Sequence, residues 1–144
     1  MTAQQIVQAG QGQNYDWAND HIYVKTPLNL TDGRVTMIED SLKPGFHLAR
    51  HLHKVMTEIF YILEGEVVFK FDDETILATP GMTVNIPPNT WHDVQCVKGG
   101  KLITIFSPGG FESYLAEMAT LTQEQFADGA LMTALAEKYD IWNS

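Results

Sequence analysis

Hydrophobic and polar positions alternate in short segments over the first three quarters of the chain. Each segment ends at turn residues such as Lys43-Pro44-Gly45, Asp72-Asp73 or Gly99-Gly100. Short alternating runs that recur about every 8–12 residues between turn signals are typical of β-sandwiches and barrels. The pattern therefore predicts an all-β protein with strands at 21–26, 33–40, 46–53, 57–63, 65–71, 74–78, 82–86, 91–97 and 101–107.

The period changes after Pro108-Gly109-Gly110. Residues 111–118 fit one short helix. Thr122 then has the character of a helix N-cap, with Gln125 as its capping-box partner. From Phe126 to Leu135 the apolar positions form one helical stripe, which predicts a second helix packed on the core or on another subunit. These elements divide the chain into an N-terminal arm (1–20), a β-barrel (21–107) and a helical C-terminal extension (108–144).

Bulk composition narrows the choice of partners and compartment. The 144 residues fit one domain, and the net charge of -9 argues against nucleic acid and anionic membranes as main partners. Cys96 is the only cysteine, so an internal disulfide is excluded and a reducing cytoplasm fits best. Residues 1–13 lack the features of a signal peptide, and the longest apolar run, 59–63, is too short to span a membrane.

Candidate chemistry begins with His51-Leu52-His53. Residues i and i+2 of a strand point to the same face, so both imidazoles would project together. Such a pair alone is equally typical of surface histidines on an edge strand. Glu58, however, shares a strand face with Phe60 and Ile62, which suggests that it points inward. An ionised carboxylate on an apolar inward face is costly unless it is paired or bound to a cation.

A third histidine, His92, follows the Pro87-Pro88 turn and shares a face with Val94 and Cys96. Imidazole and carboxylate together suit divalent first-row transition metals better than calcium. Because the ligands must be unprotonated, affinity should fall as histidine titrates near its ordinary pKa of about 6.5.

Two motifs in the chain resemble those of the cupin superfamily. The first has the form G-x5-H-x-H-x3–4-E-x6-G and matches Gly45, His51, His53, Glu58 and Gly65; the second matches at Gly81, Pro87 and His92. Asn89 stands where the family usually has Gly, a mild departure because Asn tolerates left-handed backbone angles. Cys96 stands where the family usually has Asn, which changes a wall residue.

This resemblance implies a double-stranded β-helix, the cupin jelly-roll barrel, with short C-terminal helices. It also implies a homodimer and one metal ion held by His51, His53, Glu58 and His92. Only one motif pair is present, as in single-domain cupins. Three further segments are similar to those of quercetinase-like cupins: 31–34, 60–66 and 108–112.

The resemblance leaves metal and reaction open. Iron, manganese, nickel, cobalt and zinc all fit the four ligands. A tetrahedral zinc shell would be closed, whereas an octahedral ion would keep two open positions. The favoured hypothesis is a dioxygenase that acts on an enolic or phenolic small molecule, with Glu58 as base by family analogy. Apolar neighbours would raise the pKa of this carboxyl, as a base of this kind requires. The alternatives are an oxygen-independent lyase, isomerase or cyclase, and a non-catalytic binding protein.

Inward parity predicts an aromatic and aliphatic pocket lined by His47, Phe60, Ile62, Phe69, Val94, Cys96 and Phe106. His47 shares parity with His51 and is expected at the pocket mouth, either as a substrate contact or in a structural hydrogen bond. Cys96 is more typical of a packing residue than of a reactive thiol. Glu112 either ties the extension to the barrel or is a solvated charge.

Overall fold

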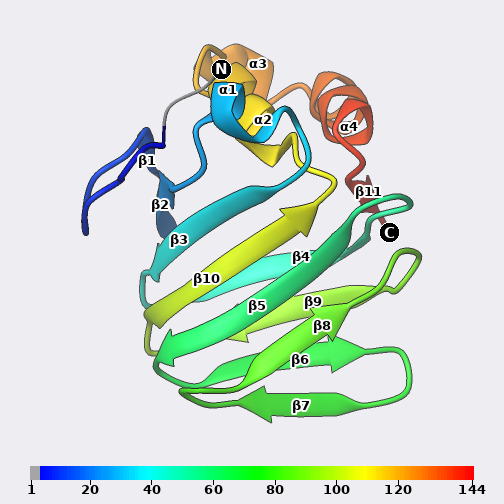
Figure 1. Cartoon of the computed structure of the whole chain (residues 1–144). Helices are drawn as coiled ribbons and strands as arrows, with labels where there is room; N and C mark the ends of the chain where they lie inside the picture. Colours follow the sequence, from blue (N-terminus) through cyan, green and yellow to red (C-terminus); the bar gives the residue numbers. More distant parts are fainter. Residues whose placement is uncertain (1–3) are drawn as a thin grey trace.

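The computed structural model describes residues 4–144 and shows two antiparallel sheets that face each other (Figure 1). One sheet has, in spatial order, β1 (Asn14–Asp16), β2 (Asp20–Val24), β3 (Thr36–Leu42), β10 (Gly100–Ser107), β5 (Thr57–Glu64) and β8 (Thr83–Ile86). The other has β11 (Trp142–Asn143), β4 (Phe46–Leu52), β9 (His92–Cys96), β6 (Val67–Phe71) and β7 (Thr75–Ala78).

All nine strands that the alternation predicts are present, and the largest shift is the start of β3 at Thr36 instead of 33. Two short strands carry too little pattern to be predicted. Residues 14–16 of the expected arm form β1, which pairs with β2. Residues 142–143 of the expected helical extension form β11, which pairs with β4.

The core has two parts. The larger one fills the space between the sheets and includes Phe60 and Phe69, whose rings meet edge to face at 5.0 Å. The smaller one lies at the end of the barrel that carries the helices, where Phe106 and Leu115 pack together with Met56. The second part attaches the C-terminal extension to the barrel by burial of apolar surface.

Glycine and asparagine occupy turns that require left-handed backbone angles. Gly65 has φ of 90°, and a Cβ atom there would lie 2.8 Å from the carbonyl oxygen of Gly99. No other residue fits that turn, which explains the glycine of the first motif. Asn89, at the usual glycine position of the second motif, has φ of 63°, as its tolerance of that region predicts.

The helices are α1 (Leu28–Thr31), α2 (Phe111–Met118), α3 (Gln123–Phe126) and α4 (Gly129–Lys138). The capping box of Thr122 and Gln125 is confirmed. The prediction of one continuous helix beyond it is wrong. The carboxylate of Asp128 accepts the N–H of Leu131 and starts a new helix, which ends α3 after one turn.

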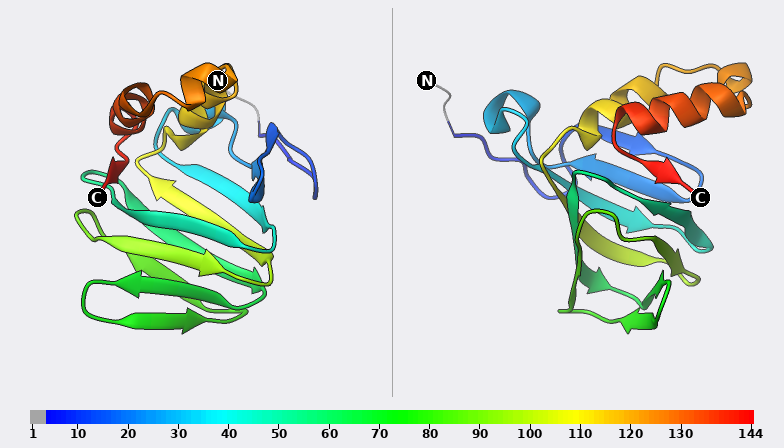
Figure 2. Two further views of the ribbon diagram at one scale, coloured as in Figure 1. Left: turned by 180° about the vertical axis from the view of Figure 1, so that it is seen from behind. Right: turned by 90° about the vertical axis from the view of Figure 1, so that its right-hand side faces the viewer.

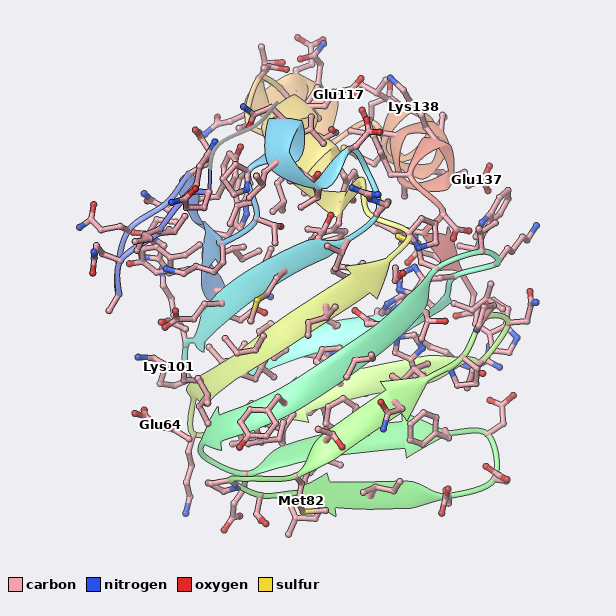
Figure 3. The ribbon with its side chains drawn as sticks, viewed as in Figure 1. Glu64, Met82, Lys101, Glu117, Glu137 and Lys138 are labelled. Atoms are coloured by element: carbon pink, nitrogen blue, oxygen red, sulfur yellow. The ribbon has the colours of Figure 1, made fainter. Side chains whose placement is uncertain are left out.

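Contacts of acidic side chains hold the extension in place. Buried Glu112, in the first turn of α2, accepts a hydrogen bond from the hydroxyl of Thr36 in β3, so the tie to the barrel is confirmed. Glu117 of α2 receives Lys138 Nζ at 3.1 Å and the Tyr139 hydroxyl, and these contacts join α4 to α2 (Figure 3). From α4 the chain turns back to the barrel as β11 (Figure 2).

Among residues 4–144, no helix has the length and apolar character needed to cross a bilayer.

A buried acid pair lies on the inner face of β2 and β3. Asp20 and Asp40 are 6% and 5% exposed, and Asp40 accepts a hydrogen bond from the Thr104 hydroxyl at 2.8 Å. Burial raises the pKa of Asp40 to about 6, although hydrogen bonds from Asp20 and Thr104 oppose the rise. Burial and the adjacent Asp40 charge raise the pKa of Asp20 well above its ordinary value. The pair therefore holds one shared proton at neutral pH.

The shared proton gives stability a defined pH dependence. Both carboxyls bind protons more tightly in the folded chain than in the unfolded one, so the free energy of unfolding falls as pH rises above about 4. The fall continues through about 6 for Asp40 and to higher pH for Asp20. Asp20→Asn replaces the protonated acid with a neutral amide and should flatten this fall. We expect the Tm of the variant minus that of wild type to rise by about 3 °C or more between pH 4.5 and pH 8, which corresponds to roughly 1 kcal/mol.

The measurement is thermal unfolding followed by circular dichroism across that pH range. Asp73→Asn is the matched control, because Asp73 is an exposed loop residue. Parallel pH profiles for Asp20→Asn and wild type would contradict the shared proton.

Candidate metal centre

Four buried side chains from the two sheets converge inside the barrel. Strand β5 of one sheet supplies Glu58. The opposite sheet supplies the histidines: His51 on β4, His53 just after β4, and His92 on β9. One ligand atom from each residue lies within 4.8 Å of those of the others. All four residues are at most 8% exposed. The structure thus brings together the complete set of ligands predicted from the two motifs.

An irregularity in β4 aims the histidines inward. Leu48 pairs with Val94 and His51 pairs with His92. Between these pairs, β4 has two residues where β9 has one. The extra residue is a β-bulge, and it reverses the alternation along the strand. Phe46 and Leu48 face the interior before the bulge, and His51 and His53 face it afterwards.

Each imidazole is oriented by a backbone carbonyl. The Nδ1 atoms of His51, His53 and His92 donate to the carbonyl oxygens of Ala49, Asp140 and Thr90 at 2.7, 2.8 and 2.9 Å, respectively. A nitrogen that faces a carbonyl oxygen carries a proton, so Nδ1 is the protonated position in all three rings. Every Nε2 atom is thereby directed at the shared centre as the coordinating nitrogen.

The charge of Glu58 is balanced by two of these rings. Its Oε1 lies 3.0 Å from His92 Nε2 and 3.3 Å from His53 Nε2. Burial alone would raise the pKa of Glu58, but the close His53 imidazole and the hydrogen bond from His92 lower it to about 2. Burial lowers the pKa of His53, and the Glu58 carboxylate more than reverses this, so the pKa is raised overall. Sequence parity suggests apolar neighbours and a raised pKa for Glu58; that expectation is wrong because imidazoles surround the carboxylate.

His51 differs from the other two rings. Burial and the neighbouring His92 lower its pKa to about 4. The ring is therefore neutral at physiological pH, and its Nε2 lone pair is free. A neutral imidazole is the form that coordinates a metal.

These features fit a divalent transition metal. Ligand atoms about 2.1 Å from a common ion lie at most about 4.2 Å apart. The four ligand atoms here, all within 4.8 Å of one another, are near that limit before an ion draws them together. Among residues 4–144, buried His53 Nε2 has no hydrogen-bond partner of proper geometry, although it faces the other ligands. A metal ion would satisfy this nitrogen and the Glu58 charge together.

A cavity of about 200 Å³ opens onto three of the four ligands, His51, His53 and Glu58. His92, only 1% exposed, lies behind them. The remaining walls are mainly apolar and come from β4, β10, α2 and the C-terminal strand: Leu48, Ala49, Phe106, Phe111, Tyr114, Ile141 and Asn143. Burial raises the pKa of the Tyr114 hydroxyl, which is therefore neutral beside the cavity. Small molecules can thus reach the site from the side of the helical extension.

The structure places the predicted wall residues in three different surroundings. Phe106 lines this cavity, and Phe60 lines a smaller neighbouring one of about 70 Å³ that also touches Glu58. The other inward residues pack in the core away from both cavities: Ile62, Phe69, Val94 and Cys96, each at most 1% exposed. Parity reports correctly that they point inward but does not say how far along the barrel the ligand space extends.

The prediction for His47 requires a correction. Its imidazole is exposed on the outside of the sheet and meets the Asp93 carboxylate at 2.7 Å. The cause is the bulge, because His47 and His51 lie on opposite sides of the extra residue and so lose their common parity. Of the two roles considered for His47, the structural contact is the one observed.

Sequence reasoning missed the wall residues of the extension. Phe111, Tyr114, Ile141 and Asn143 lie 19 to 51 positions after His92, outside the barrel segment. The helical spacing of Phe111 and Tyr114 indicates only packing, and the two C-terminal residues carry no periodic pattern. The signal that could have pointed to the extension is Gly109-Gly110, which lets the chain turn over the barrel end immediately after β10.

Comparisons with known proteins agree with this fold and site. Residues 39–106, which include all four candidate ligands, match the family described as the cupin domain. The chain is 26% identical over 110 residues to quercetin 2,3-dioxygenase of Bacillus subtilis (strain 168), an alignment that covers 76% of this chain and 33% of that protein. The chain thus spans about a third of the length of this curated relative.

Solved structures show the same architecture. An RmlC-like cupin from Shewanella frigidimarina superposes with a TM-score of 0.67 and 20% identity, covering 77% of this chain and 96% of that one. Pac13 of Streptomyces, a nucleoside dehydratase, gives a TM-score of 0.61 and 17% identity, covering 78% and 88%. These similarities confirm the predicted jelly-roll barrel with short helices.

Metal binding should stabilise the fold through the four ligands. At a free metal concentration of about 100 times Kd, the gain is roughly 2.7 kcal/mol, or about 5–10 °C in Tm for a domain of this size. We expect one ion per chain, and His51→Ala should abolish both the ion and the rise in Tm. His47→Ala is the matched control, because it removes a histidine of the same strand outside the site. Elemental analysis and thermal unfolding with and without metal measure both effects. Full metal content in His51→Ala, or loss of metal in His47→Ala, would contradict the site.

Proposed function

Since residues 39–106 match the cupin domain, we propose that the protein is a metal-dependent enzyme, a dioxygenase that acts on a compact enolic or phenolic molecule. The observation that carries the proposal is the cavity that reaches His51, His53 and Glu58 while His92 stays behind them. A structural site would be closed on all sides, whereas a catalytic site needs access for substrate.

Donor chemistry favours a six-coordinate ion over a closed zinc shell. Three imidazoles and one carboxylate suit iron, manganese, cobalt or nickel, and such an ion would keep two positions for exogenous ligands. Bound there, it would supply Lewis acidity and a meeting point for substrate oxygen and dioxygen. The four side chains named above would hold it.

The chain's own residues provide binding, orientation and a proton acceptor. Phe106 and Phe111 stack at 4.5 Å beside the cavity and offer an apolar wall to a planar substrate. The Glu58 carboxylate is ionised across the physiological pH range and can accept a proton, but the low pKa set by His53 and His92 makes it a weak base until a metal takes over these imidazoles. We assign to it the removal of the proton from the substrate's enol or phenol oxygen.

Cavity size limits the substrate. Drug-sized ligands occupy pockets of about 300–1,000 Å³, and the space here is about 200 Å³. A compact enol, such as a small 1,3-diketone, fits this volume better than a three-ring flavonol. Support for oxygen chemistry comes from the relative quercetin 2,3-dioxygenase. The alignment has 26% identity and covers only 33% of that protein.

The same small cavity also favours a second candidate, an oxygen-independent lyase, isomerase or cyclase. Such a reaction needs one open metal position and a base, but no space for dioxygen. The fold of the nucleoside dehydratase Pac13 shows that a barrel of this type can host an elimination. Dioxygen dependence separates the two candidates.

Oxygen uptake provides that test. Protein loaded separately with iron, manganese, cobalt or nickel is mixed with a small 1,3-diketone or with a flavonol, and dissolved oxygen is recorded. We expect at least one metal form to consume one dioxygen per substrate, with faster turnover of the diketone. If no form consumes oxygen while substrate is still converted, the second candidate replaces the first. Binding of a substrate without its conversion by any metal form would support the non-catalytic binding alternative.

The role of Glu58 can be tested separately. Glu58→Gln keeps an amide oxygen for the metal but removes the base, so turnover should fall by about 10²-fold or more. Glu64→Gln is the control, since Glu64 is an exposed carboxylate at the end of the same strand (Figure 3). Metal content and steady-state rates are measured for both. Full turnover by a metal-loaded Glu58→Gln variant would remove Glu58 from the proposed role.

A further inference from the structure

Helix α4 ends at a turn whose backbone geometry is unusual for its residue. The N–H of Ile141 donates to the carbonyl of Ala136 at 2.9 Å, and that of Asp140 to Glu137 at 3.1 Å. These two hydrogen bonds together form a Schellman motif, in which the left-handed position is usually Gly and sometimes Asn. Here Asp140 holds that position with φ of 65°. Asp tolerates this position less well than Gly, but its side chain makes contacts that Gly could not make.

The Asp140 carboxylate caps the loop between the two ligand-bearing strands. Its oxygens accept the backbone N–H groups of Lys54, Val55 and Met56 at 2.7, 2.9 and 2.8 Å. This loop follows His53 immediately and leads into β5, which carries Glu58. Hydrogen bonds to an ionised acceptor are among the stronger ones, so three of them fix the loop to the end of α4.

The backbone carbonyl of the same residue orients a candidate ligand. Asp140 O accepts the hydrogen bond from His53 Nδ1 at 2.8 Å. The acceptors for His51 and His92 lie two residues before each histidine, at Ala49 and Thr90. His53 alone among the three depends on a carbonyl 87 residues away. Its orientation therefore requires the C-terminal segment to be docked.

Residues 140–143, which we call the docking segment, make further contacts with the same region. Trp142 Nε1 donates to Asp140 Oδ1 at 3.1 Å, and Lys54 Nζ lies 3.4 Å from the centre of the Trp142 ring. The segment then pairs with β4 as β11, with Asn143 opposite His51. Ile141 and Asn143 also line the cavity over the metal ligands. In Figure 1, β11 descends from α4 to the strand ends where the loop of residues 53–56 lies.

We propose that Asp140 is a positioning residue for His53, so that docking of residues 140–143 and metal binding reinforce each other. The proposal rests on the metal site described under the proposed function and adds a means of regulating it. Coupling of this kind is reciprocal: if docking raises metal affinity, metal must stabilise the docked segment by the same factor. Release of the segment would loosen His53 and open the cavity wall at the same time.

Asp140→Gly tests the proposal because glycine suits the left-handed turn. The variant keeps the Schellman motif and loses the carboxylate that holds the loop. The variant also keeps the carbonyl that accepts His53 Nδ1, but without the carboxylate this carbonyl is no longer fixed to the loop. Outright loss of a group that orients a metal ligand typically costs about 10–100-fold in metal affinity, so we expect a rise in the Kd for cobalt(II) of up to this size. Titration with a competing chromogenic chelator measures it, with circular dichroism and Tm of the metal-free protein as checks of folding.

Asp32→Gly is the matched control. Asp32 also follows a helix and has φ of 52°. The variant therefore makes the same change of residue type in the same backbone region. It lies at the end of α1, far along the chain from the docking segment, and should leave the Kd unchanged. If Asp140→Gly does not fold, Asp140→Asn keeps the turn and one acceptor oxygen, and a smaller rise in Kd is expected.

Hydrogen exchange tests the reciprocal effect. Addition of cobalt(II) to the wild-type protein should slow amide exchange at residues 141–143, and this protection should be reduced in Asp140→Gly. A variant that binds cobalt(II) with wild-type affinity while residues 141–143 exchange rapidly would overturn the proposal.

A metal-free readout separates this proposal from the proposed function. Nitrogen-15 NMR of the imidazole rings should show His53 protonated at Nδ1 in wild type and a change of its ring signals in Asp140→Gly, with His51 and His92 unaffected. If wild type binds no metal yet the His53 signals change, the metal function fails and the positioning role stands. Unchanged His53 signals in Asp140→Gly would reject the positioning role, whether or not metal binds.

Discussion

The arrangement of the barrel interior depends on the burial of one carboxylate. Glu58 is 3% exposed between two sheets, where an ionised group is tolerated only with close compensation. His53 and His92 supply that compensation, and carbonyls of the backbone hold each ring in place. The strands that carry these residues must therefore keep a fixed register, since a slip of one residue would turn the side chains to the opposite face.

Strand alternation and two motifs were sufficient to predict the barrel and its four candidate ligands, because both rest on local spacing. Alternation fails where the backbone is irregular. His47 lies outside the cavity because of the bulge before His51, and nothing in a run of exposed and apolar residues reveals an extra position. The low pKa of Glu58 was equally inaccessible, since it depends on His53 and His92, which are brought to it by the opposite sheet. Local pattern identifies ligands, whereas tertiary contacts determine their protonation.

Much of the cavity wall comes from outside the matched cupin domain. Phe111 and Tyr114 belong to α2, and Ile141 and Asn143 belong to the docking segment, all beyond residue 106. The barrel supplies the chemistry of the site, and the extension shapes the space above it. Proteins with the same four ligands can therefore differ in substrate through this region alone, which is consistent with the many activities that one fold can host.

The bulge in β4 also has a consequence for how the gene can change. Ala49 borders the cavity, whereas the exposed Arg50 side chain lies outside it, so replacement of Arg50 leaves the cavity walls unchanged. Deletion of either residue would be different in kind, because it would restore regular alternation and turn His51 and His53 out of the barrel. The length of this segment is thus more tightly constrained than the identity of residue 50. Alignments of related sequences should show variable residues there at constant length.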